Sequence, residues 1–134
     1  MYLIDTNIWL ERLLEQTRAN EVGSFLEHVS SSELYITDFA FHSICVILMR
    51  FKKQQALLDF VQDVFIDGAV ALASILPEET QSVMNAVNEY NVDFDDAYQL
   101  AAADKYDLVI VSFDSDFDRT SRGKKTPAEI LATI

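Results

Sequence analysis

The sequence predicts an α/β fold, a three-layer α/β/α sandwich with a central parallel sheet. Three observations support this fold class. Short apolar runs alternate with amphipathic helical segments along the whole chain, which is the order of strand and helix units in a parallel sheet. The apolar runs at 2–4 and 108–111 both stop at acidic residues, as strands do when they carry a site at their carboxyl ends. The length of 134 residues suffices for one domain with a core and is too short for two ordinary domains.

The first half of the chain is predicted to hold two strands and their helices. The apolar run at 2–4 ends at Asp5, and Thr6 and Asn7 follow as residue types that cap helices. Apolar residues at helical spacing then predict a short helix that ends near Gln16. The same reasoning predicts, in chain order, a helix from about 20 to 29, a strand at 34–36 and a long apolar helix from 39 to about 51.

The second half continues the alternation. We expect a helix over 54–67 closed by Gly68, a strand at 70–73 and a helix opened by Pro77. A helix over 97–105, capped by Asp95 or Asp96, and a strand at 108–111 should follow. The last element is a helix whose cap is Thr126. No repeat, linker or low-complexity tract interrupts this order. We therefore expect a single domain over residues 1–134.

The charge balance argues against a general nucleic-acid binder. Ten basic and 22 acidic residues give a net charge of −12, whereas such proteins hold nucleic acid by neutralising phosphates. Metal ions or local basic patches would have to attract a polyanionic substrate. The basic residues form two groups, which are either solvated faces or contacts for a substrate or partner: Arg50, Lys52 and Lys53, then Arg119, Arg122, Lys124 and Lys125.

The composition also bears on location. No apolar stretch approaches the roughly 18 residues of a membrane span, and Met1 leads directly into the first predicted strand without a signal peptide. We expect a soluble cytoplasmic protein without membrane contact. The one cysteine, Cys45, lies in an apolar stretch and is expected to be a small buried hydrophobic residue.

Four carboxylates occupy positions where a shared site is expected. Asp5 follows the first strand, Asp96 begins a helix, and Asp114 and Asp116 follow the strand at 108–111. Converging carboxylates repel one another unless a cation neutralises them, and Mg²⁺ or Mn²⁺ is the hard ion that oxygen ligands suit. Such a site activates water for phosphodiester hydrolysis. The sequence lacks a glycine-rich phosphate loop, a nucleophile elbow and paired Cys-His ligands.

These carboxylates also have simpler interpretations. The acids at 114–118 resemble the start of an EF-hand loop, but Arg119 stands where that loop needs glycine and Lys125 where it needs glutamate. Asp5 and Asp96 are also suitable as helix caps or first-turn acids. Because acids coincide with element ends in three places, a shared site is the favoured interpretation. His28 and His42 are expected to be structural or solvated.

The residues at 3–7, 95–97 and 111–117, taken in order, resemble the acidic motifs of PIN-domain ribonucleases, particularly the VapC-type toxins of toxin–antitoxin pairs. The resemblance runs from Met1 to about Phe117. It implies a Mg²⁺- or Mn²⁺-dependent endoribonuclease, often a homodimer, inhibited by a small antitoxin protein. It also implies roles for individual residues: metal-binding and catalytic acids at Asp5, Asp96, Asp114 and Asp116, and polar supports at Asn7 and Ser112. The charge pattern separately makes the second basic group the candidate RNA contact: Arg119, Arg122, Lys124 and Lys125.

One position departs from the family pattern. PIN domains usually carry a glutamate early in the helix after the second strand, where this chain offers His42 or Ser43, with Asp38 nearby as a possible substitute. The loss of one acid predicts weaker metal binding or a single ion. A catalytically weak or inactive PIN-fold protein that binds RNA or a protein is therefore the alternative function. A receiver-like signalling module is disfavoured, because Thr6 follows Asp5 where an acidic pair is needed.

Overall fold

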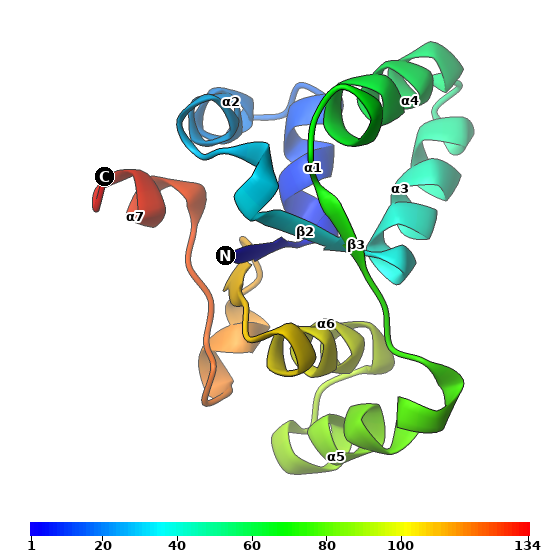
Figure 1. The fold of residues 1–134 in the computed structure, drawn as a ribbon, viewed down its shortest axis with the longest axis vertical. Helices are drawn as coiled ribbons and strands as arrows, with labels where there is room; N and C mark the ends of the chain where they lie inside the picture. The colour runs from blue at the N-terminus through cyan, green and yellow to red at the C-terminus, as the bar shows by residue number, and fades with distance from the viewer.

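Four short parallel strands form the centre of the molecule in a computed structural model that describes residues 1–134 (Figure 1). The strands are β1 (Tyr2–Ile4), β2 (Leu34–Thr37), β3 (Ala71–Ala73) and β4 (Val109–Val111). Their order in the sheet is β3-β2-β1-β4, so β1 pairs with β2 on one side and with β4 on the other. The first and last strands of the chain are therefore neighbours, and their carboxyl ends meet at one edge of the sheet.

Helices cover both faces of the sheet, as the strand and helix alternation predicts (Figure 1). One face carries α1 (Thr6–Leu13), α2 (Ala19–His28), α3 (Asp38–Arg50) and α4 (Gln54–Val61). The other face carries α6 (Phe94–Tyr106), against which α5 (Thr80–Tyr90) packs. The short C-terminal helix α7 (Pro127–Leu131) returns to α2, where the backbone N–H of Ala128 donates to Glu21.

Two apolar cores lie on either side of the sheet because neighbouring residues of a strand point to opposite faces. Ile4 of β1 belongs to the core beneath α1, α2 and α3, whereas Leu3 belongs to the core beneath α5 and α6. The middle of helix α6, residues 97–103, is buried and contributes small side chains to that second core, namely Ala97, Ala101, Ala102 and Ala103. Small side chains let this helix approach the sheet closely. Its first turn is thereby placed beside the strand ends.

Several predicted elements differ in detail from the observed ones. The helix expected over 54–67 is α4 followed by a π-helical turn at Gln62–Ile66, and Pro77 opens a 3₁₀ turn (Pro77–Glu79) ahead of α5. Further 3₁₀ turns occur at Ser31–Glu33 and at Ser115–Arg119, the latter labelled η4. The predicted cap of α7 is confirmed, since Thr126 Oγ1 accepts from the backbone N–H of Glu129 at 3.2 Å.

Two further features of the helices concern the single cysteine and the possibility of a membrane span. Cys45 is half-buried on α3, so the expectation of a buried residue was wrong. It lies four residues before the exposed Met49, on the same side of the helix, and beside the buried face that Ile44 and Leu48 form. None of the helices has the length and apolar character that crossing a membrane requires.

Candidate active site

Asp5 lies where β1 ends and α1 begins, and its carboxylate is almost fully hydrogen-bonded. Oδ1 accepts from the backbone N–H of Thr6 at 2.9 Å and from Gln99 Nε2 at 3.0 Å. Oδ2 accepts from Ser112 Oγ at 2.8 Å. Burial raises the pKa of Asp5, and these hydrogen bonds oppose that rise because they stabilise the ionised form. Asp5 is therefore both the cap of α1 and a buried acid of the candidate site.

Ser112 and Asn7 tie the end of β4 to the end of β1. The fully buried Ser112 hydroxyl accepts from Asn7 Nδ2 at 3.1 Å and from the backbone N–H of Asp114 at 3.0 Å, while it donates to Asp5. Asn7 Oδ1 accepts in turn from the backbone N–H of Phe113 at 3.2 Å. These two polar side chains hold the loop that carries Asp114 against the loop that carries Asp5.

The third acid, Asp96, comes from the first turn of α6. Asp93 is the cap of this helix, since its Oδ1 accepts from the backbone N–H of Asp96 at 3.0 Å. The expectation that Asp95 or Asp96 caps the helix was therefore wrong, and the helix begins three residues earlier than predicted. Burial and the nearby charges of Asp93, Asp114 and others raise the pKa of Asp96 to about 7. A carboxylate this perturbed at the mouth of a cleft is typical of functional sites.

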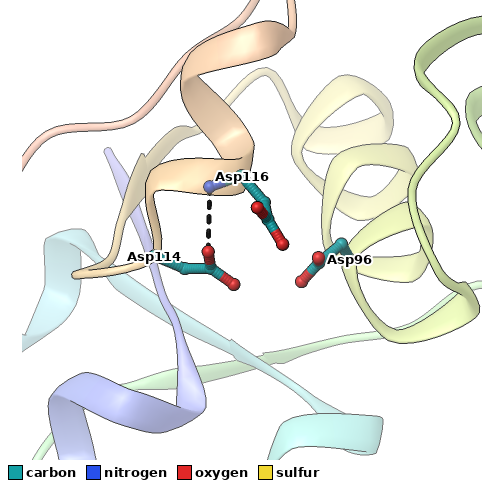
Figure 2. A group of neighbouring side chains, drawn as sticks. All are labelled: Asp96, Asp114 and Asp116. Carbon is teal, nitrogen blue, oxygen red and sulfur yellow. Dashed lines mark hydrogen bonds between the residues drawn. The ribbon is translucent and has the colours of Figure 1, made fainter.

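Asp96, Asp114 and Asp116 converge on one point, as Figure 2 shows. One carboxylate oxygen from each lies within 4.8 Å of the others. The backbone N–H of Asp116 donates to Asp114 Oδ1 at 2.8 Å, so the turn of η4 brings both acids to the same side (Figure 2). Asp5 is not a member of this group of three, but it is near enough for its charge to raise the pKa of Asp96.

A cleft of about 300 Å³ opens beside these acids. It is lined by residues of α1, α3 and α6: Asp5, Thr6, Asn7, Leu10, Phe39, Ser43, Ile47, Asp95, Asp96 and Gln99. Of the residues considered for the missing glutamate, only Ser43 lines this cleft, whereas His42 is exposed to solvent. The carboxylate of Asp38 instead accepts from Tyr98 Oη at 2.7 Å and from the backbone N–H of Phe39.

Sequence reasoning missed Gln99, a buried residue of α6 that contacts Asp5. The Gln99 side chain is only 3% exposed, and it connects Asp5 to Thr37, the cap of α3. The residue type alone does not indicate that a helical glutamine points inward. The one available indication is its place three residues after Asp96, on the face of a helix whose other members are apolar.

The four basic candidates begin at Arg119, the last residue of η4, and continue along the segment after it, and three of them form ion pairs within the chain. Arg122 pairs with Asp104 at 2.8 Å and donates to the backbone carbonyl of Leu108, which ties the segment to the end of α6. Lys124 pairs with Asp118, and Arg119 lies 3.9 Å from Asp116. Lys125 pairs with β4 through its backbone, since its N–H donates to the carbonyl of Ile110.

The donor set fits a hard divalent cation. The side chains that converge here offer carboxylate oxygens, with hydroxyl and amide groups around them, and no sulfur or imidazole ligand. Oxygen ligands of this kind suit Mg²⁺ and Mn²⁺. Neutralisation by a cation would also relieve the mutual repulsion of the acids.

Solved structures with the same fold cover nearly the whole chain. A toxin–antitoxin complex from Klebsiella pneumoniae has a chain that is 21% identical, with a TM-score of 0.75 and coverage of 95% of this chain and 98% of that one. The sarcin-ricin loop cleaving toxin VapC20 of Mycobacterium tuberculosis is 14% identical, with a TM-score of 0.74 and coverage of 88% and 93%. FitAcB from Neisseria gonorrhoeae is 17% identical, with a TM-score of 0.73 and coverage of 96% and 99%.

The sequence itself identifies the family. No curated protein matches the chain by sequence. The PIN domain profile, by contrast, matches residues 2–123, a range that contains all four strands and every acid of the candidate site. Together with the parallel sheet and the acids at its carboxyl edge, this match shows that the chain belongs to the PIN domain family.

Proposed function

We propose that this protein is a metal-dependent endoribonuclease of the toxin type, which hydrolyses RNA phosphodiesters with Mg²⁺ or Mn²⁺. The observation that carries the proposal is the convergence of Asp96, Asp114 and Asp116 beside the buried Asp5, in a chain of a nuclease family. We assign these four acids to holding the ion and to catalysis. Asn7 and Ser112 are assigned to the support of that site, on the basis of their hydrogen bonds.

The chain's own residues have distinct parts in the proposed reaction. An ion bound here would lower the pKa of a water molecule and neutralise charge on the phosphodiester. Asp5 is held in one orientation by the Ser112 hydroxyl, and Asp114 by the backbone N–H of Asp116. The Asp96 side chain accepts no hydrogen bond, and only the backbone N–H of this residue is bonded to Asp93. Its pKa of about 7 lets it take up a proton near neutral pH.

The basic segment after η4 is the proposed RNA contact. It follows the loop that carries Asp114 and Asp116, so phosphates that neighbour the scissile bond would pass over it. Lys125 forms no ion pair within the chain, and Arg119 has only a 3.9 Å contact with Asp116. These two side chains are therefore the ones best able to exchange their present surroundings for phosphate oxygens.

A second function is favoured by one observation. Ser43 stands on the cleft where a family glutamate is expected, and the loss of that negative oxygen weakens the hold on a cation. A PIN-fold protein that binds RNA or a protein partner without cleavage would retain the same cleft. Cleavage assays separate the two functions directly.

A small antitoxin partner is proposed for a second, largely apolar cleft of about 480 Å³ between α1, α2 and α4. Trp9 lines this cleft, and its buried indole N–H donates to no acceptor in the chain. A partner segment with apolar side chains would cover the apolar surface of this cleft and remove it from water. A short neighbouring reading frame for a DNA-binding protein would provide the candidate. The expected homodimer stays a prediction, which the mass of the purified protein in solution tests.

The proposed function is tested by incubation of the purified protein with a panel of single-stranded RNAs, in Mg²⁺, in Mn²⁺ and in a chelator. We expect endonucleolytic cleavage that requires a divalent ion and is lost in Asp5→Asn. Asp67→Asn is the matched control, because it makes the same change of charge ahead of β3, at the opposite edge of the sheet. Ion binding without cleavage of any RNA would favour the non-catalytic function.

A further inference from the structure

We infer that Gln99 is a positioning residue that leaves Asp5 with one free lone-pair position, on Oδ2, and thereby favours Mg²⁺ and Mn²⁺ over Ca²⁺. The inference rests on the proposed function, because it takes Asp5 to be a ligand of the ion. It concerns the geometry that Gln99 imposes on this ligand, which the acidic residues alone do not determine.

The orientation of the Gln99 amide is fixed by its neighbours. Thr37 Oγ1 accepts from the backbone N–H of Ala40 at 2.9 Å, and its single proton is donated to Gln99 Oε1 at 2.7 Å. The amide nitrogen must then face Asp5, to which it donates at 3.0 Å. A flipped amide would set its oxygen against the Asp5 carboxylate, which is repulsive. Thr37 and Gln99 are both buried, so water does not compete for these bonds.

The hydrogen bonds of Asp5 leave its two oxygens in different states. A carboxylate has about four lone-pair positions, two on each oxygen. On Oδ1, the backbone N–H of Thr6 and the side chain of Gln99 fill both positions. On Oδ2, Ser112 fills one position, so one remains. Asp5 can therefore offer an ion a single oxygen only, and that oxygen is Oδ2.

The free position is on the oxygen that Ser112 joins to the loop of Asp114. The Ser112 hydroxyl that binds Oδ2 also accepts from the backbone N–H of Asp114, so Oδ2 is the oxygen beside the loop of Asp114. Oδ1 is the oxygen beside Gln99 and the start of α1. Asp5 and Asp96 line the same cleft. Gln99 thus bonds to Oδ1 and leaves Oδ2, the oxygen joined to the Asp114 loop, as the one with a free position.

A ligand limited to one oxygen discriminates between ions. Mg²⁺ requires near-octahedral geometry with short bonds, which single oxygens satisfy, whereas Ca²⁺ takes more oxygens and often binds a carboxylate through both. While Gln99 occupies Oδ1, Asp5 cannot bind an ion through both oxygens. Without Gln99, Oδ1 has a free position and two-oxygen binding becomes available. Gln99 therefore lowers the affinity of the site for Ca²⁺ more than its affinity for Mg²⁺.

The test measures the affinities of the purified full chain for Mg²⁺, Mn²⁺ and Ca²⁺ by calorimetry. Gln99→Met removes both hydrogen bonds at similar side-chain length. We expect the ratio of Mg²⁺ to Ca²⁺ affinity to fall by roughly 10-fold, the lower end of the effect typical of groups that orient metal ligands. Thr37→Val removes the donor that fixes the amide, and we expect a smaller fall of the same sign. Tyr98→Phe, which changes a buried hydroxyl on the same helix, should leave the ratio unchanged.

The ratio of the Mg²⁺ and Ca²⁺ affinities is the decisive readout, because the loss of a merely structural residue would lower the affinity for every ion by the same factor. If folded Gln99→Met loses affinity for Mg²⁺ and Ca²⁺ equally, or loses affinity for neither, the inference is overturned and the proposed function still stands. If Gln99→Met fails to fold, the ratio in Thr37→Val decides. A wild-type protein that binds none of these ions would overturn the proposed function and this inference together.

Discussion

Ser112 Oγ donates to Asp5 Oδ2 at 2.8 Å, a bond between residues 107 positions apart that closes the candidate site. Ser112→Ala would leave the buried Oδ2 without a donor, and would leave Asn7 and the backbone of Asp114 without an acceptor. We expect the free energy of unfolding to fall by about 1–3 kcal/mol. We expect Mg²⁺ affinity to fall by roughly 10- to 100-fold.

Urea unfolding and calorimetry measure these two effects of Ser112→Ala. Ser82→Ala is the control, because the Ser82 hydroxyl is exposed and bonds only to a carbonyl of the preceding turn. Retention of full Mg²⁺ affinity in Ser112→Ala would show that the hydroxyl has no part in holding Asp5 for an ion.

The stability of the metal-free protein should depend on the protonation of Asp96. Burial and the charges of Asp93 and Asp114 raise its pKa to about 7, from a model-compound value of 3.8. Between these two values the folded chain retains a proton at Asp96 that the unfolded chain releases, so the free energy of unfolding falls as pH rises. Above the upper value both states are ionised and the penalty is constant. We expect the Tm to fall across this window, and to fall less in Asp96→Asn.

Thermal melts in a chelator, at intervals across that pH window, test this dependence. Saturating Mg²⁺ should reduce the slope, because the ion stabilises the ionised carboxylates. Identical slopes for wild type and Asp96→Asn would show that Asp96 titrates as it does in the unfolded chain.

Restoration of an acid on α3 should strengthen ion binding at one position only. Ser43 lines the cleft, whereas the side chain of His42 is exposed outside it. Ser43→Glu would add a carboxylate oxygen opposite Asp96, and glutamate is well tolerated within helices. We expect Mg²⁺ affinity to rise by about 10-fold in Ser43→Glu, through one additional charged ligand, and to stay unchanged in the matched variant His42→Glu. Calorimetric titration of both variants gives the comparison, and equal affinities in the two would refute the placement.

The basic segment after η4 should divide into structural and RNA-binding members. Arg122 pairs with Asp104 and donates to the carbonyl of Leu108, so Arg122→Ala should lower the free energy of unfolding by about 1–2 kcal/mol. Arg119→Ala and Lys125→Ala should leave stability nearly unchanged. Each of these two should instead flatten the salt dependence of RNA binding, by roughly 0.7 in the logarithmic slope for single strands. Urea unfolding and RNA titrations at several salt concentrations separate the two classes, and an unchanged slope would assign the segment to solvent or to a protein partner.

The sequence predicts the positions of Asp5 and Asp114 well, because a short apolar run that stops at an acid is a local pattern. Parallel strands bring their carboxyl ends to one edge, so the meeting of β1 and β4 follows once the fold class is known. The capping of α6 was harder to predict, since Asp93, Asp95 and Asp96 are all residue types that suit a helix start. Only the backbone geometry selects Asp93.

The role of Gln99 could not be predicted, for a physical reason. Its partners, Asp5 and Thr37, lie at the carboxyl ends of β1 and β2, and both bonds depend on how closely α6 approaches the sheet. That distance is set by the small side chains of α6, which carry no polar signal. The contacts of the Arg122 side chain with Asp104 and Leu108 likewise depend on the path of the chain after η4. That path could not be predicted, because the residues there show no helical or strand periodicity.

The pairing of β1 with β4 has a consequence for the order of events during synthesis. Asp5 leaves the ribosome first, but its partner Ser112 and the acids at 114 and 116 are translated only after about four fifths of the chain. Until then β1 has no neighbour on that side, and three of the hydrogen-bonded contacts around Asp5 and Asn7 cannot form. A nascent or prematurely terminated chain that stops before Val109 therefore carries only Asp5 and Asp96, half of the proposed ligands, and lacks the strand that brings the other two acids beside them.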